Sequence, residues 1–168
     1  MKPIDHIGLK QCKLQADFFE QSVKKTNCSS GIFIRRFMLS ELAERIDKSG
    51  IMSESKTIDD MFTEIENQYG PSNYGKTKYN PEELHWIGYL YRYWAYTEEK
   101  SSKCLYRIIK PEELRNLYIP YHSLDPAKAI DRIKESKSIA ETDDIQRGVE
   151  IMRMIHDRNS EKGYIIMH

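Results

Sequence analysis

The chain has 168 residues, a length that suits one domain or one domain with a small appendage, and 39% of them are hydrophobic, enough to bury a core. Its 26 basic and 26 acidic residues balance to a formal net charge of zero, which argues against a dominant nucleic-acid or membrane-surface footprint. Three scattered cysteines without a C-x-x-C spacing indicate reduced thiols in a cytoplasmic protein, and no apolar run suits a signal peptide or a membrane span.

Helical periodicity begins in the N-terminal part of the chain. Apolar residues recur at helical spacing over 11–25, and a second pattern over 31–48 follows serines that can cap it. Arg35 and Arg36 lie in the middle of that second pattern, beside apolar positions. They are either solvated arginines or a docking contact for an acidic partner.

The next pattern opens with a capping signal. Thr57, with Asp60 three residues later, has the spacing of a capping box and predicts a helix that runs to Tyr69. A polar, turn-rich loop over 70–79 follows. It lacks the G-x-x-x-x-G-K-[ST] pattern, so we do not expect it to hold nucleotide phosphates.

The stretch over 81–97 is the richest in large apolar surface and holds both tryptophans of the chain. Asn80, Pro81 and Glu83 suit the cap and the first turn of a helix, so the pattern favours a helix over a partly alternating strand. Gly88 lies where a neighbouring helix can approach closely. We expect core packing for the aromatic side chains, because few basic residues flank them and a base-stacking platform needs such residues.

Short helical patterns over 101–109 and 112–119, joined by a tight Lys110-Pro111 link, have the layout of a helix-turn-helix. A recognition helix exposes basic and amide side chains toward base edges, and this stretch offers a modest set of them. A DNA-binding regulator is therefore the alternative function.

The C-terminal part shows two further helical patterns. Asp125 caps a helix that is followed by a hydrophilic connector over 135–141. A last helix over 142–163 then carries its apolar residues at helical spacing, and the tail over 164–167 is either a short strand or an exposed apolar segment. Those apolar residues are Ile145, Val149, Met152 and Ile155.

Together these patterns predict an all-α fold, an irregular multi-helix bundle of about seven helices around a central aromatic helix (81–97). The six prolines and eight glycines are too few for a turn-rich β protein. We expect one helical domain over 1–140, with the C-terminal helix and tail over 141–168 packed on it.

Recognisable catalytic and metal-binding motifs are missing. None of the five histidines occurs in H-E-x-x-H or in a paired His/Cys spacing, so we expect no metal, no cofactor and no enzymatic activity. His122, three residues before Asp125 in a turn, suits a structural hydrogen bond. An active site assembled in space would instead predict a deep cleft lined by His122 or His156.

The segment Ala95–Lys110, followed by Leu117–Asp125, resembles a group of small uncharacterised helical proteins from Firmicutes. Their shared pattern is a helix, a Ser-rich cap, a short helix and a Tyr-x-x-Tyr-His turn, which ends here at Tyr121 and His122. The stretch Asn27–Phe37 is similar to longer members of the group. These proteins are associated with genes for ADP-ribosyltransferase-like toxins, which implies an antitoxin role for the companion protein.

The resemblance and the lack of catalytic motifs lead to one expected function. We expect a cytoplasmic bacterial interaction protein that neutralises a partner toxin by direct binding, with a helical surface covering the active cleft of the partner. The candidate binding residues are Arg35, Arg36, Tyr121, His122 and Asp125.

Overall fold

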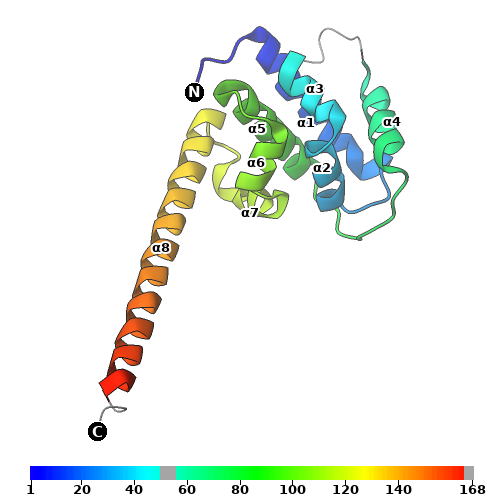
Figure 1. Cartoon of the computed structure of the whole chain (residues 1–168). Helices are drawn as coiled ribbons and strands as arrows, with labels where there is room; N and C mark the ends of the chain where they lie inside the picture. The colour runs from blue at the N-terminus through cyan, green and yellow to red at the C-terminus, as the bar shows by residue number, and fades with distance from the viewer. Residues whose placement is uncertain (50–55, 165–168) are drawn as a thin grey trace. The chain divides into compact units, whose positions relative to one another are not determined.

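The computed structural model describes residues 1–49 and 56–164 of the chain, and it describes side chains over 1–48, 56–138 and 144–158 (Figure 1). These residues form eight α-helices, slightly more than the expected number, and the described ranges contain no β-strand, so the all-α prediction is confirmed. The helices are α1 (His6–Lys25), α2 (Ser30–Met38), α3 (Glu41–Ser49), α4 (Ile58–Tyr69), α5 (Pro81–Glu98), α6 (Ser102–Ile108), α7 (Pro111–Tyr121) and α8 (Pro126–Tyr164).

The chain divides into two compact units, Met1–Ala127 and Lys128–His168. The first unit contains α1 to α7 and the second contains nearly all of α8.

Helix α1 begins at His6, earlier than the apolar pattern over 11–25 predicts. Its start is set by Asp5, whose Oδ1 accepts the backbone N–H of Gly8 at 2.8 Å and the hydroxyl of Tyr96 at 2.7 Å. These hydrogen bonds, the one from Gly8 first, lower the pKa of the Asp5 carboxyl. The start was missed because an N-cap bond of this kind needs no apolar periodicity.

The helix predicted over 31–48 is two helices, α2 and α3, which meet at Ser40. The Ser40 Oγ donates to the carbonyl of Phe37 at 2.6 Å and accepts the backbone N–H of Ala43 at 3.0 Å. One hydroxyl therefore closes α2 and opens α3. The apolar periodicity continues across this break because both helices turn their apolar side chains toward the same core.

The predicted aromatic helix is α5, with Pro81 in its first turn and the Glu83 carboxylate accepting the Asn80 N–H at 3.0 Å. It packs chiefly along α1. A β-carbon at Gly88 would lie 2.8 Å from the carbonyl oxygen of Gln15 and 3.1 Å from the Cα of Ala16, so the expected close approach is confirmed. The core therefore lies along the α1–α5 pair rather than around α5 alone.

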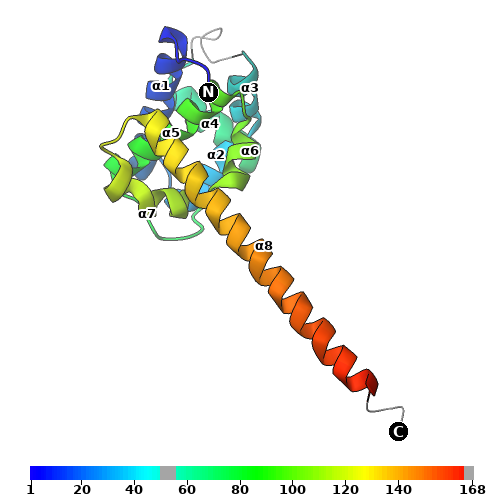
Figure 2. The same cartoon turned by 90° about the vertical axis from the view of Figure 1, so that its left-hand side faces the viewer.

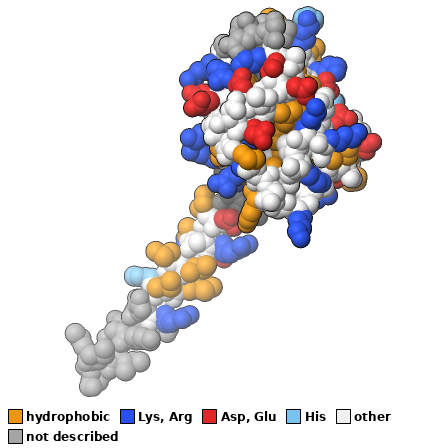
Figure 3. All heavy atoms as spheres, turned by 90° about the vertical axis from the view of Figure 1, so that its right-hand side faces the viewer, with side chains coloured by type: hydrophobic (Ala, Val, Ile, Leu, Met, Phe, Trp, Pro, Cys, Tyr) orange, Lys and Arg blue, Asp and Glu red, His pale blue; other side chains and the backbone are white. Residues whose placement is uncertain are grey.

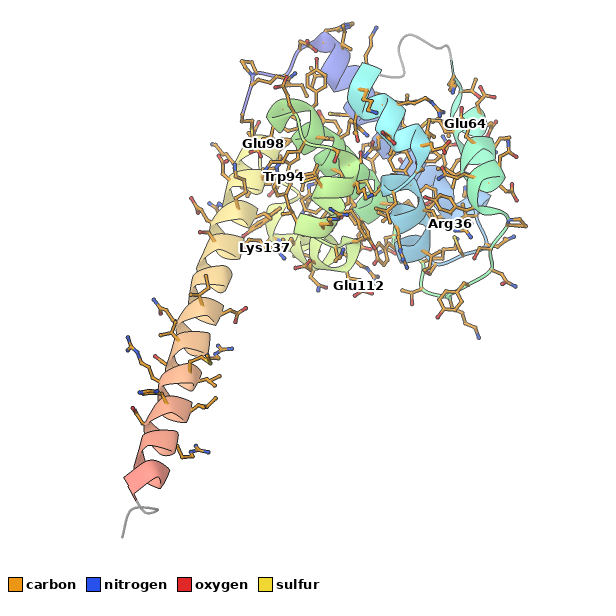
Figure 4. All side chains as sticks on the ribbon, in the orientation of Figure 1. Arg36, Glu64, Trp94, Glu98, Glu112 and Lys137 are labelled. Atoms are coloured by element: carbon orange, nitrogen blue, oxygen red, sulfur yellow. The ribbon has the colours of Figure 1, made fainter. Side chains whose placement is uncertain are left out.

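The two tryptophans of α5 differ in burial. Trp94 is 1% exposed, and its Nε1–H donates to the carboxylate of Glu98 at 2.9 Å, one turn further along the helix (Figure 4). Trp86 is half-buried and meets the ring of Tyr118 edge-on, with centroids 5.8 Å apart. Core packing is confirmed for Trp94, whereas Trp86 lies at the edge of the core.

Another part of the core consists of five phenylalanine rings from α1, α2 and α4 that pack on one another: Phe18, Phe19, Phe33, Phe37 and Phe62.

Helix α8 is one uninterrupted helix, as both ribbon views show (Figures 1 and 2). The Asp125 carboxylate accepts the N–H of Ala127 at 3.0 Å, as expected of a capping residue. The connector predicted over 135–141 is part of this helix, because the segment has no Gly or Pro and consists largely of good helix formers. Of the predicted tail, Tyr164 ends α8, and 165–167 lie outside the described residues.

Candidate protein-interaction surface

One side of the C-terminal part of α8 carries exposed apolar side chains. Ile145, Val149, Met152 and Ile155, here called the α8 apolar face, are between 46% and 69% exposed. At 100° per residue they lie within an arc of about 120°. Figure 3 shows exposed apolar side chains along the helix of the second unit. Ile151 and Met154 are also exposed and lie outside this arc. Neighbouring apolar side chains exposed on one helix are typical of a binding surface rather than of random surface residues.

The spacing of the α8 apolar face follows a known recognition pattern. Residues i, i+4, i+7 and i+10 of an amphipathic helix can insert into a hydrophobic groove of another protein. Gly148 lies within the same arc, and a β-carbon added there would meet no atom within 4 Å. A partner backbone could therefore approach α8 closely at Gly148.

Charged side chains of both signs border the α8 apolar face. Asp144 lies beside one edge of this face and Arg153 near the other. Arg147, which forms an ion pair with Asp144 at 3.7 Å, and Glu150 lie toward the opposite side of the helix. Exposed ion pairs of this kind contribute little to stability. The border resembles the polar rim of a protein interface, with no excess of positive charge for a nucleic acid.

The arginines predicted to bind a partner lie on α2. Arg35 is exposed, whereas Arg36 donates from Nη1 to the carbonyl of Gly70 at 2.7 Å and lies over the ring of Tyr69 at 5.4 Å. Figure 4 marks Arg36 on α2. Arg36 therefore holds the C-terminal end of α4, which is a structural role.

Tyr121, His122 and Asp125 lie together where α7 ends and α8 begins. The His122 Nδ1 lies 2.8 Å from the carbonyl oxygen of Tyr118, and its ring stacks on the Tyr118 ring with centroids 4.6 Å apart. His122 and Asp125 thus make local contacts that shape the turn. Within the described residues, no hydrogen bond, ion pair or ring contact joins this group to Arg35 or Arg36.

Helices α6 and α7 occupy the positions of the predicted helix-turn-helix. The first turn of α7 is acidic, with Glu112 and Glu113, and acidic side chains there repel the phosphates of DNA (Figure 4). Arg115 donates from Nε to the Glu83 carboxylate at 3.0 Å and lies over the Tyr79 ring at 4.5 Å. These contacts engage Arg115, whereas Lys103, Arg107 and Asn116 are exposed, and DNA binding stays an untested alternative.

Two hollows of the first unit differ in size and in lining. A hollow of about 90 Å³ beside Cys28 and Phe33 is smaller than the 300 Å³ or more that small-molecule sites usually occupy. A larger one of about 510 Å³ has Arg92 and Asp47 in its wall, but these groups bond to each other. His122 and His156 are both exposed, which does not fit a deep catalytic cleft.

Three possible metal ligands come together on the outer side of the α1–α5 pair. Asp17 and Glu20 on α1 and His85 on α5 each place one ligand atom within 4.8 Å of the others. No local spacing of histidines or cysteines marks this group, because His85 lies far from the two carboxylates along the chain.

Comparison with family models, with curated proteins and with solved structures finds no match to this chain. Among the described residues, no helix is long and apolar enough to cross a bilayer.

Proposed function

We propose that this protein is a non-enzymatic interaction module that binds a partner protein through the α8 apolar face. Following the resemblance described above, the partner is an ADP-ribosyltransferase-like toxin and the chain acts as its antitoxin or regulator. The proposed mechanism is occlusion, in which α8 lies in the active cleft of the partner and excludes substrate. The observation that carries the proposal is the exposure of Ile145, Val149 and Met152 on one side of a helix.

Burial of this face would give a clear gain in free energy on binding. Each fully buried Val, Ile or Met side chain contributes about 1.5–3 kcal/mol relative to an exposed one. The mixed charges at the border would add orientation rather than affinity. An apolar helix face bordered by balanced charge suits a hydrophobic groove on a protein, and it does not suit a nucleic acid.

Co-expression tests the proposal. A neighbouring gene that encodes the partner should arrest growth when expressed alone, and wild-type chain should restore growth. We expect Val149→Asp to abolish the rescue, because a carboxylate buried in an apolar groove costs several kcal/mol. Purified wild-type chain should also co-elute with the partner in size-exclusion chromatography, and the Val149→Asp variant should not.

Met154 provides the matched control. It is 62% exposed and lies on the opposite side of α8 from Ile145 and Val149. Met154→Asp should therefore rescue growth as wild type does. A neighbour that is harmless alone, that stays toxic beside wild type, or that is equally neutralised by Val149→Asp would contradict the proposal.

A gel-shift assay on the promoter of the gene separates this proposal from the DNA-binding alternative. At moderate salt, an occluding protein should leave the DNA unshifted. Arg107 is an exposed basic residue of α6, within the predicted helix-turn-helix. A shift that disappears in an Arg107→Ala variant would favour the helix-turn-helix instead.

A further inference from the structure

The α1–α5 pair carries a group of side chains that neither the core nor the α8 apolar face uses. Asp17 and Glu20 are three residues apart on α1, so they share one side of that helix. His85 lies in the second turn of α5 and faces them, with its Nε2 at 3.4 Å from the Asp17 Oδ1. Asp17 and His85 are half-buried and Glu20 is exposed.

The backbones that carry these three residues are fixed by close packing. Gly88, three residues after His85, lets α1 approach α5, and the Gln15 Nε2 donates to the Gly88 carbonyl at 3.1 Å. Ala16 and Phe19, the neighbours of Asp17 and Glu20, are fully buried. Ligands on such rigid elements keep their geometry better than ligands on loops.

The distances between the ligand atoms suit a small divalent ion. Oxygen and nitrogen ligands bind zinc at about 2.0–2.1 Å in a tetrahedron, which places neighbouring ligand atoms about 3.3–3.4 Å apart. The Asp17 Oδ1 and the His85 Nε2 are 3.4 Å apart, and Asp17, Glu20 and His85 each have one ligand atom within 4.8 Å of those of the other two. A rotation of the exposed Glu20 side chain would bring its carboxylate to the same distance.

Lys13 orients the Asp17 carboxylate. Its Nζ donates to the Asp17 Oδ2 at 2.8 Å, which leaves Oδ1 directed at His85. Outer hydrogen bonds of this kind fix ligating carboxylates in known metal sites. The positive charge of Lys13 also opposes a nearby cation, so we expect modest rather than very tight affinity.

We propose that Asp17, Glu20 and His85 form a binding site for a divalent transition-metal ion, with zinc as the best fit, that ties α1 to α5. One imidazole nitrogen and two carboxylate oxygens favour zinc and its transition-metal neighbours over magnesium and calcium, which prefer oxygen ligands alone. Three protein ligands leave the fourth position to water.

The site is tested by titrating the metal-stripped full-length protein with zinc chloride in an isothermal titration calorimeter. We expect one zinc ion per chain, and a thermal midpoint that rises by about 5–10 °C at a hundredfold excess of zinc over the dissociation constant. His85→Asn and Asp17→Asn should each weaken zinc binding at least tenfold. Both side chains are partly exposed, so the metal-free variants should melt near the wild-type temperature.

His122→Asn is the matched control, because it removes an exposed histidine that lies outside the site. It should bind zinc as wild type does. If Asp17→Asn or His85→Asn fails to fold, Glu20→Gln tests the site in its place. The visible spectrum of bound Co²⁺ is a second measurement of coordination. Wild type that binds no zinc, or that binds it no better than His85→Asn does, would overturn the proposal, and so would an equal loss in His122→Asn.

Discussion

Cys12 lies on α1 with none of its surface exposed, and burial raises the pKa of its thiol from an ordinary value of 9.0 to about 12. Cys104, in α6, is only half-buried. The pKa of the Cys12 thiol is higher in the folded protein than in the unfolded chain. The contribution of this buried thiol to stability is therefore complete below about pH 9 and is lost as the pH rises toward 12. The thiolate is the reactive form, so burial withholds both the charge and the access that alkylation needs.

We therefore expect iodoacetamide to modify Cys104 well before Cys12 in the native protein, at about pH 8 where free thiols begin to ionise. Peptide mapping by mass spectrometry measures the order of labelling. In guanidinium chloride, all three cysteines should label at similar rates. Equal labelling of Cys12 and Cys104 in the native state would show that the α1–α5 contact opens readily.

At the scale of elements, a buried arginine connects four helices. Arg92 of α5 donates to Gln15 of α1 at 2.8 Å, to Asp47 of α3 at 2.7 Å and to Ser102 of α6 at 3.1 Å. The Asp47 carboxylate also accepts the backbone N–H of Ser102 at 2.7 Å. The Arg92 side chain is 2% exposed and Asp47 is 11% exposed, so solvent screens this pair little.

We expect Arg92→Met to lower the free energy of unfolding by about 3–5 kcal/mol, because it leaves the Asp47 carboxylate without its cation. Urea denaturation measures the loss. Adding Asp47→Leu to Arg92→Met should recover much of it, since an apolar pair no longer leaves a charge uncompensated. Arg115→Met, which removes a more exposed ion pair with Glu83, should cost under about 1 kcal/mol. Similar costs for the two single variants would refute a special role for Arg92.

Across the whole molecule, our proposal separates the residues that fold the first unit from those that bind a partner. Every side chain described between Asp144 and Arg158 is exposed. We expect a chain that ends at Ser138 to keep the thermal midpoint of the full chain within about 2 °C, as measured by circular dichroism. It should also lose rescue in the co-expression assay. A midpoint lowered by several degrees would mean that the removed residues support the fold.

Local capping was the most predictable part of this fold. The cap and first-turn positions that the sequence indicates are occupied by Ser29, by Thr57 with Asp60, and by Pro81 with Glu83. A cap is a contact between residues two or three apart, so it depends only on neighbouring residues. Ser40 was missed because its hydroxyl joins two helices whose apolar patterns run on without a gap.

The contacts of the candidate site residues depend on the tertiary structure. Arg36 and His122 both make contacts within the chain, and their binding to a partner stays a prediction. Asp17, Glu20 and His85 come together only because α1 and α5 pack side by side. No sequence spacing marks such a group when its members lie on different helices.

The helical class, most of the caps and the spacing of apolar residues along α8 follow from the sequence alone, because each depends on contacts within a few turns of chain. The burial of Arg92 with a partner from each of three other helices, and the exposure of the α8 apolar face, could be learned only from the packing of distant segments. Periodicity places apolar residues on one side of a helix, but burial of that side depends on which distant segments pack against it.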